Sequence, residues 1–120
     1  MKINRLTPIP FTYKSVLKTE WLKGNMPEVT KGLYGGILTK DNITLEHIKP
    51  HSKGGKTTLK NLALAVNVNN FKRGSKPINQ FLTKEMFEQY IEQFKGILLP
   101  NFNGNEYVNS LSKTMERILK

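Results

Sequence analysis

The chain of 120 residues contains no cysteine and only nine acidic residues, against 19 lysines and arginines. Without cysteine it can form neither a disulfide nor a zinc site with thiolate ligands, so we expect no structural zinc. The sequence has no run of 18 apolar residues, which argues against a membrane-spanning helix. The opening segment, MKINRLTPIP, lacks the apolar centre of a signal peptide. We therefore expect a cytoplasmic location without membrane contact.

Length and charge further limit the classes of protein to which the chain can belong. A chain of 120 residues with 38 % apolar content is typical of a single domain with a modest core. Residues 1–76 hold 14 Lys/Arg and four Asp/Glu, whereas residues 77–120 hold five of each, so the first part carries the whole net charge of +10. A basic segment of this kind favours a polyanionic partner, although a soluble protein with a high isoelectric point can have the same composition.

Residues 44–77, TLEHIKPHSKGGKTTLKNLALAVNVNNFKRGSKP, contain both histidines of the chain. Glu46 is the only acid in this segment and directly precedes His47, and the same segment contains seven basic residues. A carboxylate beside a histidine in a positive field favours a site for a metal ion and a phosphate over a salt bridge.

Several residues of this segment also stand in a recognisable order, with Asn61 and Asn70 at positions 14 and 23 after His47. The full set is Glu46, His47, Ile48, Pro50, Ser52, Gly54, Gly55, Asn61, Leu62, Asn70, Arg73 and Gly74. In these residues the segment resembles the core of the HNH endonucleases, and the resemblance extends over residues 32–77 when a preceding hairpin is included. Many relatives hold zinc with two cysteine pairs that are absent here, so the chain is similar to the zinc-free members.

The resemblance implies roles for four polar side chains. His47 would be the general base that takes a proton from water, and Asn61 would hold its imidazole. Glu46 and Asn70 would bind a divalent ion, Mg²⁺ or Mn²⁺, through oxygen atoms. Asn69 is a rival for the place of Asn70. Because Glu46 and His47 are adjacent on a strand and point to opposite faces in regular geometry, a joint site requires a local twist at the strand end.

The basic residues of the segment, together with His51, are the candidates for contact with DNA. They are Lys49, His51, Lys53, Lys56, Lys60, Lys72, Arg73 and Lys76. Arg73 follows Asn70 by about one helical turn, a position from which it would hold a phosphate.

We expect an α+β fold in which a ββα-metal core, residues 32–77, lies between helical decorations at 1–31 and 78–120. After an extended lead-in over residues 1–11, a helix begins at Thr12 and ends near Gly24. Residues 32–48 form a hairpin with strands at 33–38 and 43–48.

A polar loop over residues 49–60 follows, then a strand at 61–66 and a helix at 67–73 that ends at Gly74. On pattern alone, residues 59–71 could also form one helix, and the resemblance favours the strand. Two C-terminal helices are expected, one from Thr83 to Gly96 and one that begins at Asn105.

These features together predict a metal-dependent HNH endonuclease that hydrolyses DNA, in duplex form, with one nick per active site. A catalytically silent HNH scaffold that binds nucleic acid is the main alternative. A basic RNA-binding module is a third hypothesis, for which the sequence offers no aromatic-rich sheet motif. By analogy with the family, we expect the chain to come from a prokaryote, a phage or a mobile element. The C-terminal helices, 83–94 above all, are the candidate surface for a homodimer.

Overall fold

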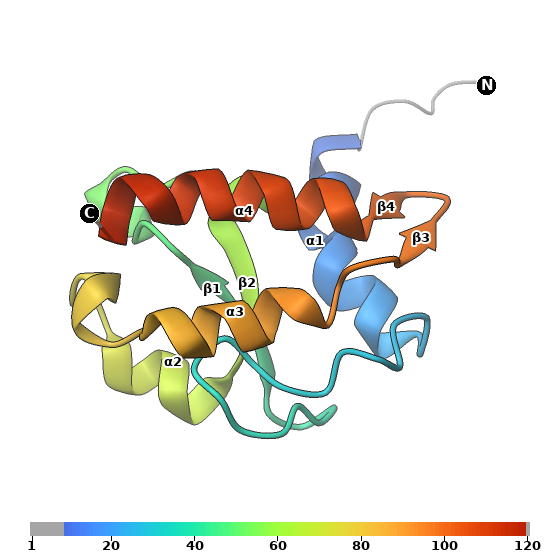
Figure 1. Ribbon diagram of the computed structural model, residues 1–120. Coiled ribbons are helices and arrows are strands. Elements are labelled where there is room, and N and C mark those ends of the chain that lie inside the picture. The colour runs from blue at the N-terminus through green and yellow to red at the C-terminus, as the bar shows by residue number, and fades with distance from the viewer. Residues whose placement is uncertain (1–8, 120) are drawn as a thin grey trace.

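The structure is a computed structural model that describes residues 9–119, and it is α+β as predicted (Figure 1). Its helices and strands are α1 (Ile9–Leu22), β1 (Ile43–His47), β2 (Leu62–Val66), α2 (Asn67–Arg73), α3 (Lys84–Glu92), β3 (Leu98–Leu99), β4 (Phe102–Asn103) and α4 (Gly104–Leu119). Three short 3₁₀ turns are η2 (His51–Lys53), η3 (Leu59–Asn61) and η4 (Ile78–Gln80). None of the described helices is both long enough and apolar enough to cross a membrane.

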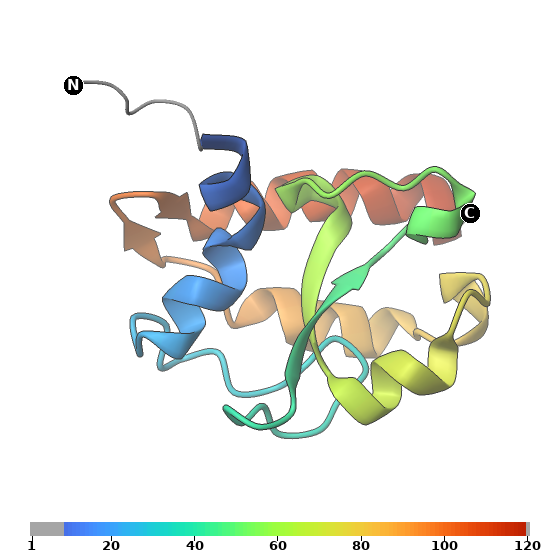
Figure 2. The ribbon, with the colours of Figure 1, turned by 180° about the vertical axis from the view of Figure 1, so that it is seen from behind.

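An antiparallel pair, β1 and β2, forms the centre of the fold, with Ile43 opposite Val66 and His47 opposite Leu62. Figures 1 and 2 show the two strands from opposite sides, with α3 and α4 together on one side of the pair. Residues 62–65 of β2 are fully buried in the core. The helix α2 follows β2 without a break, which confirms the predicted order of strand, loop, strand and helix. Residues 59–71 therefore do not form one helix, because β2 lies within them.

The expected first strand of the hairpin, residues 33–38, does not form. Gly35 and Gly36 have φ angles of +85° and +83°, and this left-handed backbone turns the chain out of an extended path. The segment instead lies against β2, where the backbone N–H of Leu33 donates to the Leu64 carbonyl at 2.9 Å. The partner of β1 is thus the later strand β2, reached across the long loop.

The start of the first helix and the end of α3 differ from the expected positions. The first helix begins at Ile9, not at Thr12, so the end of the expected extended lead-in is helical; residues 1–8 of that lead-in lie outside the described part of the chain. Thr83 caps α3 as predicted, since its hydroxyl accepts from the N–H of Met86 at 3.1 Å. That helix ends at Glu92, four residues before Gly96.

A short hairpin, β3 and β4, occupies the segment that we expected to be a loop before the last helix. Its strands have two residues each, too few for an alternating pattern to be visible in the sequence. The last helix begins at Gly104, where Asn103 accepts from the N–H of Glu106 at 3.1 Å. Asn105, the expected cap, accepts instead from the N–H of Gly96 at 3.0 Å.

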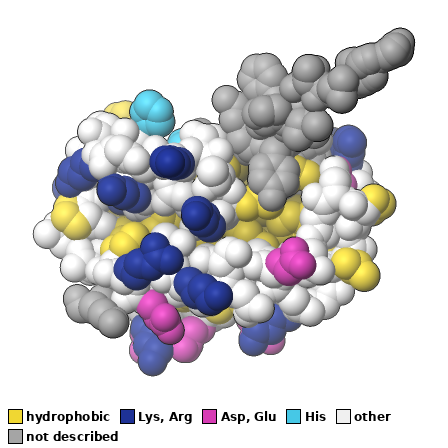
Figure 3. Space-filling view, turned by 90° about the horizontal axis from the view of Figure 1, so that it is seen from above, with side chains coloured by type: hydrophobic (Ala, Val, Ile, Leu, Met, Phe, Trp, Pro, Cys, Tyr) yellow, Lys and Arg dark blue, Asp and Glu magenta, His cyan; other side chains and the backbone are white. Residues whose placement is uncertain are grey.

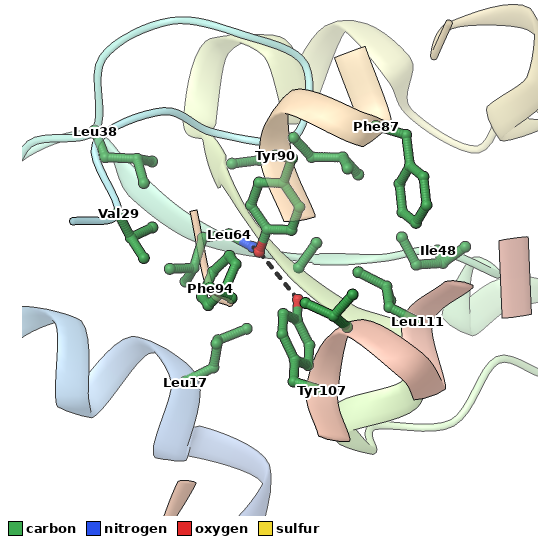
Figure 4. Close-up of a cluster of buried hydrophobic side chains, with 14 of the residues drawn as sticks. Leu17, Val29, Leu38, Ile48, Leu64, Phe87, Tyr90, Phe94, Tyr107 and Leu111 are labelled. Atoms are coloured by element: carbon green, nitrogen blue, oxygen red, sulfur yellow. Dashed lines mark hydrogen bonds between the residues drawn. The ribbon is translucent and has the colours of Figure 1, made fainter. Parts of the chain in front are cut away.

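Two buried tyrosines connect α3 and α4 to the central strand β2 (Figure 4). The Tyr90 hydroxyl accepts from the N–H of Leu64 at 2.8 Å, and the Tyr107 hydroxyl donates to the carbonyl of Leu62 at 2.7 Å. The two hydroxyl oxygens lie 3.0 Å apart. Burial raises the pKa of both phenols, so both remain protonated. They hold β2, and with it α2, against the helical layer.

The apolar face of α3, which we considered for a homodimer, belongs to this core. Phe87 and Tyr90 are 7 % and 1 % exposed. The outward side chains of this helix are polar or charged: Lys84, Glu85, Glu88, Gln89 and Glu92. Among the described residues of α3 no apolar side chain is fully exposed, with Met86 and Ile91 partly buried against the core, and dimerisation through this helix is not supported.

The tyrosine pair generates a prediction about stability. Tyr107→Phe leaves the buried Leu62 carbonyl without its donor and should lower the free energy of unfolding by about 1–3 kcal/mol. Tyr90→Phe should have a similar effect, and because the two hydroxyls bond to each other, the double variant should deviate from the sum by more than about 0.5 kcal/mol. Urea unfolding of the four proteins measures this. Strictly additive effects would mean that the two hydroxyls act independently.

Candidate active site

A cavity of about 330 Å³ lies where the end of β1, the following loop and the end of α2 meet. The residues that border it are Leu45, Glu46, His47, Pro50, His51, Ser52, Asn70, Gly74 and Ser75. Four of the residues that the sequence singled out therefore share one cavity. Glu46 and His47 both border it although they are neighbours on β1.

Glu46 is buried, with 4 % of its surface exposed, and its Oε2 accepts from two donors. These are the Nη1 of Arg73, at 3.1 Å, and the hydroxyl of Tyr34. Burial, followed by the charge of Glu46, raises the pKa of the Tyr34 phenol, so the phenol keeps its proton and donates it to the carboxylate. The expectation of a carboxylate free of a salt bridge is therefore wrong. Its second oxygen, Oε1, has no hydrogen-bond partner among the described residues, and Glu46 borders the cavity.

Arg73 is 1 % exposed and does not reach outward to a phosphate, contrary to its place among the predicted DNA contacts. Besides Glu46 it binds three backbone carbonyls, those of His47 at 2.8 Å, Ile48 at 2.9 Å and Lys76 at 2.8 Å. A guanidinium has five N–H donors in one plane. In Arg73 the Nε, Nη1 and Nη2 atoms all donate hydrogen bonds. Arg73 ties the end of β1 to the end of α2.

His47 is half-buried, and its Nε2 lies 3.0 Å from the hydroxyl oxygen of Thr57. Its Nδ1 has no hydrogen-bond partner among the described residues. Burial, followed by the charge of the nearby His51, lowers the pKa of His47, and the charge of Glu46 opposes this shift only in part. The neutral imidazole, which can accept a proton, is therefore favoured at neutral pH. Thr57 was not foreseen, because a hydroxyl in a polar loop carries no sequence signal.

Asn61 does not hold the imidazole, which corrects the role that the resemblance implied. Its side-chain oxygen accepts from the N–H of Lys49 at 2.8 Å, and its amide nitrogen donates to the carbonyls of Lys49 and Lys56, at 3.1 and 2.8 Å. Asn61 thus closes the loop that follows His47. At Gly55, in the same loop, a Cβ would lie 1.8 Å from the Lys49 oxygen, so the closed loop requires glycine there.

Asn70 lies in α2, three residues before Arg73, and borders the cavity. Its amide nitrogen donates to the carbonyl of Leu45 at 3.3 Å, while its amide oxygen has no partner among the described residues. Asn69 turns away and bonds to the Gly35 carbonyl at 3.5 Å. The geometry therefore favours Asn70 over Asn69 as an oxygen donor to the cavity. Across residues 9–119, no group of three His, Cys, Asp or Glu side chains is placed to hold a metal ion.

The remaining basic residues predicted to contact DNA are exposed. They are Lys49, Lys53, Lys56, Lys60, Lys72 and Lys76, and His51 is exposed with them. Figure 3 shows Lys and Arg side chains gathered on the half of one face that also bears a histidine side chain at its edge. Lys49, Lys53, Lys56 and Lys60 thus form an exposed basic surface along the loop that follows β1.

Comparison with known proteins gives one match. Residues 33–68 match the family model described as HNH endonuclease. No curated protein and no solved structure matches the chain. The matched range covers the glycine turn, both strands of the central pair and both histidines, and it ends two residues before Asn70.

The buried ion pair generates a prediction that separates Arg73 from its exposed neighbour Lys72. Arg73→Met leaves the Glu46 carboxylate buried without its partner and should lower the free energy of unfolding by about 3–5 kcal/mol. Lys72→Met removes the same charge from the surface and should change it by no more than about 0.5 kcal/mol. Chemical unfolding followed by circular dichroism measures both. Similar losses for the two variants would place Arg73 outside the structural centre of the site.

Proposed function

We propose, on the premise that residues 33–68 match the HNH endonuclease family model, that this chain is a metal-dependent endonuclease that hydrolyses DNA phosphodiester bonds. The observation that carries the proposal is the shared cavity at the end of β1. His47, Glu46 and Asn70 all border it. Such a set can activate water and bind a cation next to a phosphate.

His47 is the general base of the proposed reaction. Thr57 fixes the ring through Nε2, so Nδ1 is the atom that takes the proton from the attacking water. The lowered pKa of His47 favours the neutral imidazole at neutral pH, and Nδ1 is the unprotonated nitrogen when Nε2–H donates to Thr57. Asn61 is a positioning residue, because it holds the loop that carries Thr57 and His51 in the closed form.

Glu46 and Asn70 are the proposed protein ligands of a divalent ion, Mg²⁺ or Mn²⁺. Their oxygen atoms suit a hard cation that keeps several waters and takes its other ligands from substrate phosphate. When bound, such an ion supplies positive charge to the phosphate and to the leaving oxygen. The guanidinium of Arg73, 3.1 Å from Glu46, offsets the charge of the carboxylate. We therefore expect the protein alone to bind the ion weakly and the protein–DNA complex to bind it more tightly.

The exposed lysines around the cavity would hold the DNA backbone. Lys49, Lys53 and Lys56 flank the loop beside His47, and Lys72 and Lys76 flank the end of α2. Contacts of this kind bind duplex DNA without regard to sequence and weaken as salt rises. With one such site among residues 9–119, each binding event would cleave one strand and produce a nick.

The second candidate function is a catalytically silent HNH scaffold that binds nucleic acid. The pairing of Glu46 with Arg73 favours it, because a neutralised carboxylate is a weaker cation ligand. The unpaired Asn70 oxygen and the free nitrogen of His47 favour catalysis, since binding alone requires neither. A divalent-ion requirement separates the two.

The test is cleavage of supercoiled plasmid at low salt with Mg²⁺, with Mn²⁺ or with chelator. The proposal expects metal-dependent conversion to the nicked form. His47→Ala should slow this conversion by about 10²–10⁴-fold while DNA binding is retained.

His51→Ala is the matched control, because it removes the other imidazole at the same cavity and should slow nicking far less. A wild type that binds the plasmid but leaves it intact in every metal would support the silent scaffold. Nicking that survives His47→Ala would refute the assignment of the base.

A further inference from the structure

A second cavity, also of about 330 Å³, lies on the other side of the loop that follows β1, between this loop and the C-terminal turns of α4. We call it the basic hollow. It is bordered by Lys49, Lys56, Lys60 and Arg117, and by Gly54, Gly55, Thr58, Asn61, Thr114 and Ile118. The loop residues among these are shared with the surroundings of the candidate active site, whereas Thr114, Arg117 and Ile118 of α4 are not. Arg117 comes from a part of the chain whose charges sum to zero.

The charges around the basic hollow have one sign. Four cationic side chains border it and no carboxylate does. Within the described part of the chain none of the four forms an ion pair. Like charges brought around one concave surface repel one another and raise the local concentration of anions. The ligand that this arrangement fits is therefore anionic.

The position of Arg117 is fixed by the way α4 packs. The Thr114 hydroxyl donates to the carbonyl of Lys60 at 2.7 Å, which joins α4 to the turn before β2. Arg117 lies three residues after Thr114, on the same side of the helix. A cation in the last turn of a helix has an ordinary role, since it stabilises the negative end of the helix dipole. That role does not account for three lysines placed opposite it.

We propose that the basic hollow binds phosphates of the DNA backbone beside the one that is cleaved, with Arg117 as the contact supplied by α4. The loop after β1 separates the hollow from the candidate active site, so a backbone that crosses this loop meets both. This inference rests on DNA as the substrate of the proposed function, but it concerns binding and not cleavage.

The test measures binding of the full chain to a short fluorescent DNA duplex by anisotropy, in chelator, over a range of salt concentrations. Arg117→Gln should weaken binding several-fold at low salt and reduce the slope of log K against log salt by about one. Lys113→Gln is the matched control. It removes the same charge from an exposed position of the same helix that does not border the hollow, and it should change affinity by less than twofold.

Two further variants guard against an effect through folding. Lys60→Gln removes a cation from the side of the hollow opposite α4 and should reproduce the loss without a change in α4. Arg117→Lys should recover part of the affinity. Equal effects of Arg117→Gln and Lys113→Gln, or no binding of DNA by the wild type, would overturn the proposal. If the hollow variants weaken binding and the wild type cleaves nothing, the hollow stands and the proposed catalysis fails.

Discussion

The buried contact between Glu46 and Arg73 is the interaction on which the candidate site depends. A charge pair removed from water is tolerated only when the remaining donors and acceptors are satisfied. Here the Tyr34 hydroxyl donates a hydrogen bond to the carboxylate, and three backbone carbonyls accept hydrogen bonds from the guanidinium. Two of these carbonyls belong to His47 and its neighbour Ile48, so the same contact that pairs the charges sets the end of β1 against α2. His47 and Asn70 face one cavity as a result.

The contact also limits what the site can do. An ion at Glu46 would lie near the fixed positive charge of Arg73. Phosphate oxygens of the DNA would then have to supply the negative charge that the neutralised carboxylate does not. In this account the metal, the DNA and the protein bind together. The basic surface would then take part in the proposed chemistry, because it would bring in the phosphate that the ion needs as a further ligand. The loop closed by Asn61 has a central place here, with the candidate active site on one side and the basic hollow on the other.

The core of the fold could be predicted because its signals are local. The helix at residues 67–73 and its end at Gly74 were predicted to the residue, since a short apolar strand, a polar helix and a terminal glycine follow one another directly. The strand expected at 33–38 was wrong, because a glycine pair can mark either a bulge in a strand or a turn outside one. The structure selects the turn through the positive φ angles of Gly35 and Gly36.

The site could be predicted in its members but not in their contacts. The sequence singled out Glu46, His47 and Asn70, and the structure brings them to one cavity. It could not show that Arg73 is buried, because a basic residue beside lysines and a glycine is typical of a surface. The partner that buries it, Glu46, is 27 positions away. Arg117 escaped notice for a similar reason, since its relation to the lysines exists only after α4 has packed.

The most direct test of the account is the position of the bound ion. Mn²⁺ added to the isotope-labelled protein, with and without a short DNA duplex, broadens the NMR signals of nuclei close to it. The account predicts selective broadening of the Asn70 side-chain amide and the His47 ring, at lower Mn²⁺ concentration when DNA is present, with the distant Asn105 side-chain amide unaffected. Broadening that is absent from Asn70 and His47, or that is indifferent to DNA, would contradict it.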